Sequence, residues 1–246
     1  MLTSCIYLAA IAGLLSLLFT PAIRGLAVRL GWVDNPDAYR KLHRTPVPRI
    51  GGVPVMLSYV ASFGIALLVS GELGRAVSEA WVPIASLLPA AAVVFGVGLL
   101  DDLVGVTPRT KLLGQCVAAA VACMGGIQIR GVAYHAIDPS IGIPLTIVWL
   151  IGCTNAFNLI DGVDGLATGV GLVATLTIVA VAALHNDAGL LIAVVPLAGS
   201  LLGFLLFNFS PASVFLGDSG SLTVGFILGC CSVIWSQKAA TLLGMC

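Results

Sequence analysis

The sequence predicts an all-α protein that crosses a membrane several times. Of its 246 residues, 59% are hydrophobic and only 9% are charged, and the mean hydropathy is +1.10. A water-soluble domain needs far more charge to cover its surface. Apolar runs long enough to cross a bilayer recur along the whole length, with no soluble domain or low-complexity linker between them. We therefore expect residues 1–246 to form a single integral membrane domain, a bundle of transmembrane helices.

The apolar runs predict eight spans. They cover residues 5–20, 52–70, 81–100, 112–127, 141–154, 166–184, 188–207 and 221–234. The first run lacks a basic start and a small-residue cleavage site, so it is interpreted as a span and not as a signal peptide. Segment 128–140 alternates weakly and predicts a short hairpin. The apolar ending, 239–246, predicts the start of a ninth span that is cut short, as in a truncated product.

The basic residues predict which way the bundle faces. The first loop is rich in Lys and Arg between residues 24 and 49, so the positive-inside rule places it in the cytoplasm. Alternation of the spans then brings five acids to the same face, namely Asp101, Asp102, Asp161, Asp164 and Asp218. Acids at the ends of several helices can build an oxygen-rich cation site.

Net charge and cysteine usage exclude other classes of protein. The formal net charge is zero, so no basic surface indicates a nucleic-acid partner. Nearly all of the seven cysteines lie inside apolar runs and form no CxxC pair. This usage is typical of small buried hydrophobic residues and not of a disulfide framework or a metal site.

Two adjacent acids end the third predicted span, in the run DDLVGVTPRTKLLGQ. Asp101 and Asp102 could bind a cation or accept a proton, because neighbouring carboxylates repel each other unless a metal or a lysine neutralises them. Lys111 follows with a positive charge suited to a phosphate. The same residues would also fit a simple turn at the membrane boundary, where acids cost little.

Amides and acids recur at every third residue in the run NAFNLIDGVDGLATG. On a helix this spacing keeps Asn155, Asn158, Asp161 and Asp164 on nearly one face. A polar hairpin is the alternative interpretation. Polar groups at membrane depth need partners, so the pattern favours a functional site.

Two further segments carry candidate binding residues. In the run FLGDSGS, Asp218 could hold a cation and the following helix N-terminus a phosphate. Phe215 could stack on a base, although a lone Phe at an interface is more often a membrane anchor. In the first loop, His43 and Arg49 could attract lipid or nucleotide phosphates, although the orientation alone requires basic residues there.

Together these motifs resemble the polyprenyl-phosphate N-acetylhexosamine-1-phosphate transferases of glycosyltransferase family 4. That family includes WecA-like GlcNAc-1-phosphate transferases, phospho-MurNAc-pentapeptide translocases and eukaryotic dolichyl enzymes. The resemblance runs from about residue 34 to residue 221, and NAFNLIDGVDGLATG followed by FLGDSGS is highly specific. The first loop, RKLHRTPVPRIGG, and the short DDLVG spacing look more like the GlcNAc branch.

The resemblance implies transfer of a sugar-1-phosphate, GlcNAc-1-phosphate in this branch, from a UDP-sugar to undecaprenyl phosphate. UMP is released, and the product enters a cell-envelope polysaccharide pathway such as lipopolysaccharide biosynthesis. The resemblance also implies a multi-pass protein of the bacterial inner membrane with a cytoplasmic active site, and a homodimer is compatible with it. Two anionic phosphates must meet, so magnesium, which manganese could replace, and a lysine would offset their repulsion.

The resemblance also assigns roles to residues. Asp101 and Asp102 would be catalytic, beside the lipid phosphate, and Asp218, Asn158 and Asp161 would hold the metal. The residues expected to bind substrate are Lys111, Asn155, Asp164, Phe215, His43 and Arg49, with Lys111 on a phosphate and Asp164 and Phe215 at the uridine.

Two alternatives to an active transferase stay open. Family members have further spans and a later cytoplasmic loop with a histidine-rich motif, so this chain is expected to be incomplete at its C-terminus. It could then be an inactive remnant that binds nucleotide or lipid. A cation-coupled transporter would also use acids in the membrane. Transporter sites usually lie near the midplane, whereas these acids lie at span ends, which favours the transferase.

Overall fold

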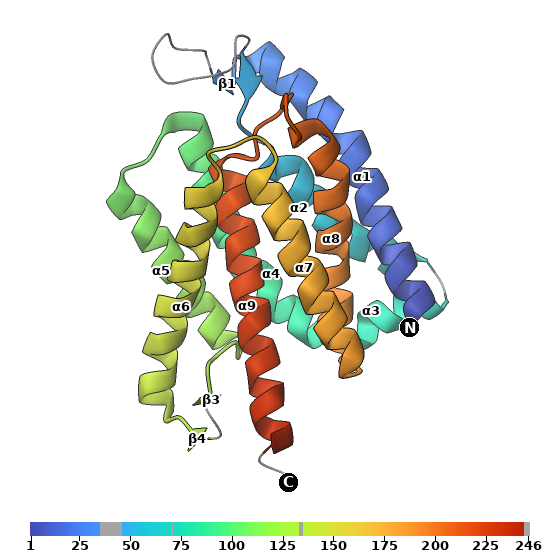
Figure 1. Ribbon diagram of the computed structural model, residues 1–246, viewed down its shortest axis with the longest axis vertical. Helices are drawn as coiled ribbons and strands as arrows, with labels where there is room; N and C mark the ends of the chain where they lie inside the picture. Colours follow the sequence, from blue (N-terminus) through green and yellow to red (C-terminus); the bar gives the residue numbers. More distant parts are fainter. Residues whose placement is uncertain (35–45, 70, 133–134, 244–246) are drawn as a thin grey trace.

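Long α-helices make up most of the chain, as the sequence predicts (Figure 1). The computed structural model describes residues 1–34, 46–69, 71–132 and 135–243. Its helices are α1 (Leu2–Leu30), α2 (Gly52–Leu68), α3 (Glu72–Glu79), α4 (Trp81–Val104), α5 (Pro108–Met124), α6 (Pro139–Ile160), α7 (Leu166–Leu184), α8 (Ala188–Asn208) and α9 (Gly217–Leu243). Its short strands pair antiparallel, β1 (Val33–Asp34) with β2 (Val47–Pro48) and β3 (Gly131–Val132) with β4 (His135–Ala136). The all-α class is confirmed.

Each of the eight predicted spans coincides with one long helix. The limits of α7 agree with the prediction, and α6 extends further, so that Asn155 and Asn158 lie on its last two turns. Among the described residues, six helices are long and apolar enough to cross a membrane. A seventh span results if α2 and α3, which meet at a 119° bend, form one broken span. The number of spans therefore stays a prediction.

The predicted beginning of a ninth span at residues 239–246 stays a prediction. Helix α9 continues without interruption to Leu243. The stretch from residue 234 to 243, IWSQKAATLL, contains neither Gly nor Pro, the two residues that most readily end a helix. Residues 244–246 lie outside the described part of the chain.

The junctions that carry the acidic motifs lie at one end of the bundle. The α4–α5, α6–α7 and α8–α9 connections and the β1–β2 pair gather there, and we call this the site end (Figure 1). The N-terminus, α3 and the β3–β4 hairpin lie at the opposite end, and the hairpin confirms the prediction for segment 128–140. The predicted gathering of the acids at one end is therefore confirmed.

Helix α9 occupies the middle of the bundle. Within its membrane-length part, Gly217–Ile234, 83% of the residues are buried, and the helix packs against α4 and α6 and also against α2 and α7. Its N-terminus therefore lies at the centre of the site end. The first residues of α9 are Gly217 and Asp218, so this packing surrounds Asp218 with side chains from neighbouring helices.

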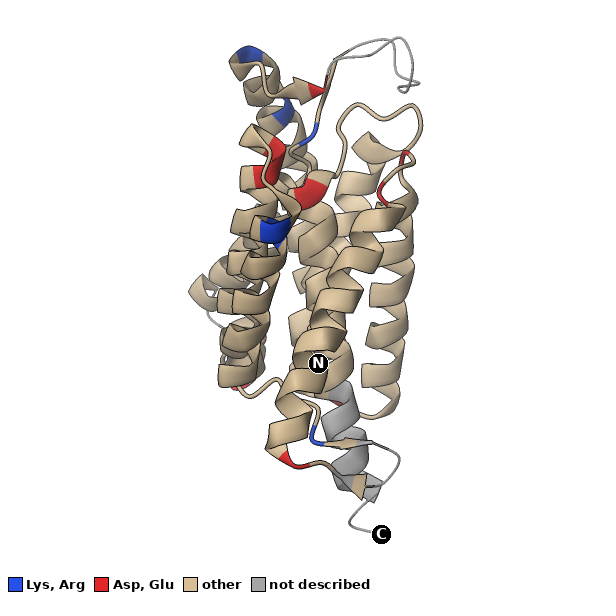
Figure 2. Cartoon of the chain, turned by 90° about the vertical axis from the view of Figure 1, so that its left-hand side faces the viewer, with Lys and Arg blue, Asp and Glu red and all other residues tan. Residues whose placement is uncertain are grey.

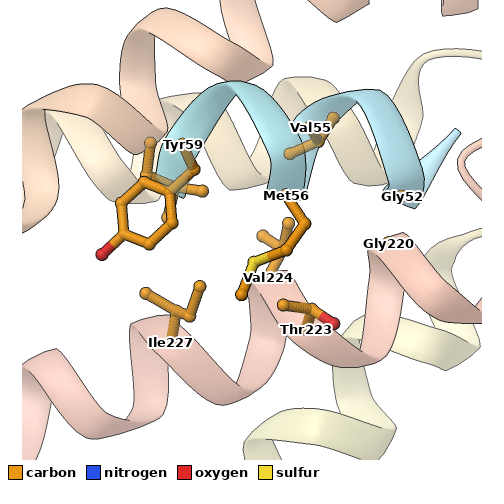
Figure 3. Close-up of a pocket in the computed structure, with 9 residues that line it drawn as sticks. Gly52, Val55, Met56, Tyr59, Gly220, Thr223, Val224 and Ile227 are labelled. Carbon is orange, nitrogen blue, oxygen red and sulfur yellow. The ribbon is translucent and has the colours of Figure 1, made fainter. Parts of the chain in front are cut away.

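The segment that leads into α2 pairs with the α8–α9 loop through backbone hydrogen bonds. The N–H groups of Gly51 and Gly52 donate to the carbonyls of Phe215 (2.9 Å) and Leu216 (2.8 Å), and the Phe215 N–H donates to Pro48 (2.8 Å). Gly52 faces Gly220 of α9 (Figure 3), and a Cβ atom on Gly52 would collide with the Gly220 backbone. The glycine thus permits a contact that fixes the first loop against α9.

Candidate active site

An ammonium group bridges two carboxylates at the site end. Lys111 Nζ, on the first turns of α5, lies 2.7 Å from Asp101 Oδ2 of α4 and also donates a hydrogen bond to Asp218 Oδ2 of α9. The three side chains are only 17–18% exposed. Figure 2 shows acidic and basic residues together near the site end. The structure thus brings Asp218 to Lys111, 107 positions away in the sequence, and to Asp101.

Helix α6 contacts Asp218 from the other side. Asn158 Nδ2 donates hydrogen bonds to Asp218 Oδ1 (2.7 Å) and to Ser221 Oγ (3.0 Å). Both carboxylate oxygens of Asp218 therefore accept a hydrogen bond from a side chain, one from α5 and one from α6. Sequence reasoning predicted that Asn158 and Asp218 lie together, and it assigned no role to Ser221.

Asp102 caps the N-terminus of α9. Its Oδ1 accepts a hydrogen bond from the Asp218 N–H (2.8 Å) and its Oδ2 from the Ser219 N–H (2.9 Å). The first N–H groups of a helix have no partner within that helix, and a carboxylate there also meets the positive end of the helix dipole. Gly217, with φ +73°, has no room for a Cβ, which would collide with Arg49 and lie 2.8 Å from Asp102 Oδ2. Asp102 is thus enclosed.

Asp161 follows the last residue of α6 and faces two other acids. Burial and, after it, the nearby charges of Asp218 and Asp102 raise its pKa to about 7, against a lowering by the Gly217 backbone. The ionised form of this carboxylate is therefore disfavoured without an added cation. A divalent ion beside Asp161 and Asp218 would reverse that preference.

The side-chain amide of Asn155 forms hydrogen bonds with Gln115, a residue to which the sequence analysis assigned no role. Its Nδ2 donates to Gln115 Oε1 (2.7 Å) and to the Ile151 carbonyl (2.8 Å), and Gln115 Nε2 donates back to Asn155 Oδ1 (3.3 Å). Gln115 is only 1% exposed. Its place near the site could have been inferred from the sequence, because Gln115 follows Lys111 by one helical turn and both side chains therefore lie on one face of α5.

Asp164 and Phe215 lie in a second part of the site end, at the α8–α9 loop. Asp164 Oδ2 accepts a hydrogen bond from the Ala212 N–H (3.0 Å), and Phe215 is half-buried in the same loop. Asp164 forms no hydrogen bond or ion pair with the Lys111 cluster among the described interactions. The two residues that were predicted to hold one ligand therefore belong to one local structure.

The first-loop residues contribute less to the described site. The Arg49 side chain is 53% exposed, and its Nη1 lies 3.6 Å from Asp34 Oδ1. An exposed ion pair of this length contributes little to stability, so Arg49 stays available to a ligand. His43 lies outside the described residues.

The oxygen donors at the site end suit a hard divalent cation. Among the residues that the structure describes, no three His, Cys, Asp or Glu side chains are arranged to hold a metal ion. Asp218, Asp161 and the amide of Asn158 nevertheless supply carboxylate and carbonyl oxygens, the ligands that Mg²⁺ takes in proteins. The Lys111 ammonium between Asp101 and Asp218 is an independent sign that this position accommodates a positive charge.

A small apolar pocket lies beneath the Gly52–Gly220 contact, between α2, α8 and α9 (Figure 3). Met56, Tyr59 and Ile227 line it, and the Tyr59 hydroxyl donates to the Ala193 carbonyl (2.9 Å). Its lining offers no charged group to a phosphate. The pocket is therefore not a candidate site for a phosphate.

Comparison with known proteins decides the family. Residues 84–236 match the family described as glycosyl transferase family 4. The chain belongs to this family. The matched region holds the acid pair at the end of α4, Lys111, the polar end of α6 and Asp218. The family resemblance expected from the motifs is thus confirmed.

Relatives from both bacterial branches of the family are similar to the chain. It is 36% identical to the decaprenyl-phosphate N-acetylglucosaminephosphotransferase of Mycobacterium tuberculosis over 236 residues, which cover 90% of this chain and 58% of the relative. It is 32% identical to a probable undecaprenyl-phosphate N-acetylglucosaminyl 1-phosphate transferase of Bacillus subtilis, with 98% and 66% covered. It is also 32% identical to the phospho-N-acetylmuramoyl-pentapeptide-transferase of Halalkalibacterium halodurans, with 92% and 72% covered.

The chain spans a little under 60% of the length of the mycobacterial relative and about two thirds of that of the Bacillus relative.

Proposed function

We propose that the chain transfers a sugar-1-phosphate, GlcNAc-1-phosphate in the first instance, from a UDP-sugar to undecaprenyl phosphate and releases UMP. One observation carries this proposal. Asp101, Lys111, Asn158 and Asp218 meet at the shared end of α4, α5, α6 and α9, three of which are long and apolar enough to cross a membrane, so a lipid phosphate at the membrane surface can reach them. Family membership and the names of the relatives support the same chemistry.

The reaction joins two anionic phosphates, and the site has groups suited to each. An oxygen of the lipid phosphate attacks the sugar-bearing phosphorus of the UDP-sugar. The bond from that phosphorus to the oxygen bridging the two phosphates breaks, and UMP leaves with that oxygen. Lys111 lies where it can offset phosphate charge. Mg²⁺, for which Mn²⁺ could substitute, would supply further charge neutralisation, held by Asp218, Asn158 and Asp161.

The two predicted catalytic acids receive different roles in this proposal. Asp101 is the residue that takes a proton from the lipid phosphate, because its Oδ2 contacts the flexible side chain of Lys111. Both oxygens of Asp102 accept hydrogen bonds from the backbone of α9, so Asp102 positions Asp218. Asp164 and Phe215 would receive the uridine on the α8–α9 loop, with Arg49 and His43 on the approach to the phosphates.

The site would face the cytoplasm of a bacterial inner membrane. The basic residues of the first loop, next to the site end, support this orientation through the positive-inside rule. UDP-sugars are cytoplasmic, so the orientation and the donor agree. The transporter alternative is less well supported, because the acids of the site lie at or next to helix ends and not at helix midpoints.

Release of UMP tests the proposal directly. The purified chain in detergent is given UDP-GlcNAc, undecaprenyl phosphate and Mg²⁺, with chelator and lipid-free controls. We expect UMP only when lipid and metal are both present, and none from Asp218→Asn. Arg109→Gln, at an exposed position on α5, is the matched control and should keep its activity. A folded chain that releases no UMP would contradict the proposal for these 246 residues.

A further inference from the structure

The hydrogen bonds to Asp218 have the wrong polarity for a metal ligand. Its Oδ2 accepts from the Lys111 ammonium and its Oδ1 from the Asn158 amide nitrogen, so both oxygens face positively polarised hydrogens. A cation that binds these oxygens must replace at least the ammonium. Lys111 therefore occupies the position on Asp218 that a bound cation would take.

Asn158 also presents a hydrogen-bond donor where a metal would need an oxygen ligand. It turns its NH₂ group, not its carbonyl oxygen, toward both Asp218 and Ser221. Rotation of the amide by half a turn would exchange the two ends and present the carbonyl oxygen to a cation. The Ser221 hydroxyl can either donate or accept a hydrogen bond, so it can remain the partner of Asn158 in both orientations.

The Lys111 side chain can move its ammonium group away from Asp218 and back without a change in the backbone. Its ammonium lies at the end of a flexible four-carbon chain, while its backbone is fixed in the first turns of α5, which begins with a Thr107 cap and Pro108. The charge that it now neutralises, Asp101 with Asp218, is the charge that a divalent ion would neutralise. Once displaced, the ammonium remains within reach of the same small region.

We propose that Lys111 is a tethered counter-ion that occupies the metal position, and that metal binding moves its ammonium off Asp218 and makes it available to a substrate phosphate. This exchange rests on the magnesium site in the proposed function. In this exchange Lys111 pairs first with the carboxylates of Asp101 and Asp218 and then with a substrate phosphate. The exchange also explains why a carboxylate cluster this enclosed can persist before a metal arrives, since unpaired carboxylates there would repel each other.

Binding of Mg²⁺ alone, without either substrate, tests the exchange. In the purified full chain, Lys111→Met removes the competitor and should tighten Mg²⁺ binding about tenfold, measured by calorimetry or by the metal-dependent shift in melting temperature. Lys111→Arg keeps the charge and a firmer grip on carboxylates, so it should weaken binding. Arg109→Met removes a charge from the exposed face of the same helix and should change binding little. Unchanged or weaker binding in folded Lys111→Met overturns the exchange.

Selective labelling tests the same step in the unaltered protein, whether or not Lys111→Met folds. The chain has three lysines, Lys41, Lys111 and Lys238, so acylation at each can be followed by mass spectrometry. Mg²⁺ should accelerate acylation of Lys111 several-fold relative to Lys238. Mg²⁺ binding without this acceleration refutes the exchange and leaves the magnesium site intact. Absence of any Mg²⁺ binding refutes the magnesium site itself and the exchange with it.

Discussion

Gln115 and Asn155 form a reciprocal pair of amide hydrogen bonds between α5 and α6, one helical turn below the cluster that contains Lys111 and Asn158. The pair is positioned to set the spacing of the two helices. On α5, Gln115 lies one turn after Lys111 and on the same helix face. On α6, Asn155 lies one turn before Asn158 and likewise on the same face. A change in this pair should therefore reach the site without touching a substrate.

Replacing both partners of this pair should cost less than the sum of the two single replacements. Gln115→Met keeps the side-chain length but leaves the Asn155 amide without its partner, which should cost about 1–3 kcal/mol of unfolding free energy and lower the rate of UMP release. Asn155→Leu should behave similarly, and the double variant should lose less than the sum of the two. A double-mutant cycle by thermal or detergent unfolding provides the measurement. Strictly additive losses would argue against the pair.

Asp102 caps helix α9 and Asp101 does not, so substitutions at these two adjacent acids should have different effects. Asp102→Ala removes the acceptor for two N–H groups of α9 and should lower stability by about 1–2 kcal/mol, together with Mg²⁺ affinity. Asp102→Asn keeps one acceptor oxygen and should restore part of both. Asp101→Asn should reduce turnover with a smaller loss of stability. Melting temperature, Mg²⁺ affinity and UMP release are measured in parallel; equal effects of Asp102→Asn and Asp102→Ala would exclude the cap.

Mg²⁺ affinity should rise with pH through the titration of Asp161. Its pKa is about 7 in the metal-free protein, above the ordinary value of 3.8, so the folded state retains a proton there that the unfolded state has already lost. Without metal, stability should therefore fall as pH rises from about 4 to about 7. A metal needs the ionised carboxylate, so affinity should increase up to about tenfold per pH unit below about pH 7 and then level off.

Asp161→Asn is the control for that pH dependence. In this variant the Mg²⁺ affinity should change little between about pH 6 and about pH 8. Calorimetry in detergent measures it. A profile that keeps its slope in Asp161→Asn would assign the titration to another group.

The helices could be predicted from sequence because each is a long apolar run with polar or glycine-containing ends. Alternation of the spans then sufficed to bring Asp101, Asp161 and Asp218 to one end. Helix α3, in the run ELGRAVSE, was missed because it is short and polar, with only Leu73 and Val77 buried.

The partners within the site could not be predicted in the same way. Which neighbour a side chain meets depends on the rotation of each helix about its axis, and apolar runs that face lipid on several sides leave that rotation undetermined. Asn155 was therefore assigned to a substrate when its partner is Gln115, and the cap that Asp102 provides was not foreseen. Both arrangements follow from the tertiary packing of α5 with α6 and of α4 with α9.

The contact between α2 and α9 should tolerate no added methyl group. A Cβ on Gly52 would collide with the Gly220 backbone, next to the hydrogen bonds that fix the first loop to the α8–α9 loop. Gly52→Ala should therefore separate the helices and cost about 1–3 kcal/mol. The matched control is Gly64→Ala on the same helix, where a Cβ meets nothing within 4 Å. There the helical preference of Ala should leave stability unchanged or raise it by up to about 1 kcal/mol. Melting temperatures in detergent separate the two; an equal response would show that the close approach at Gly52 does not constrain the fold.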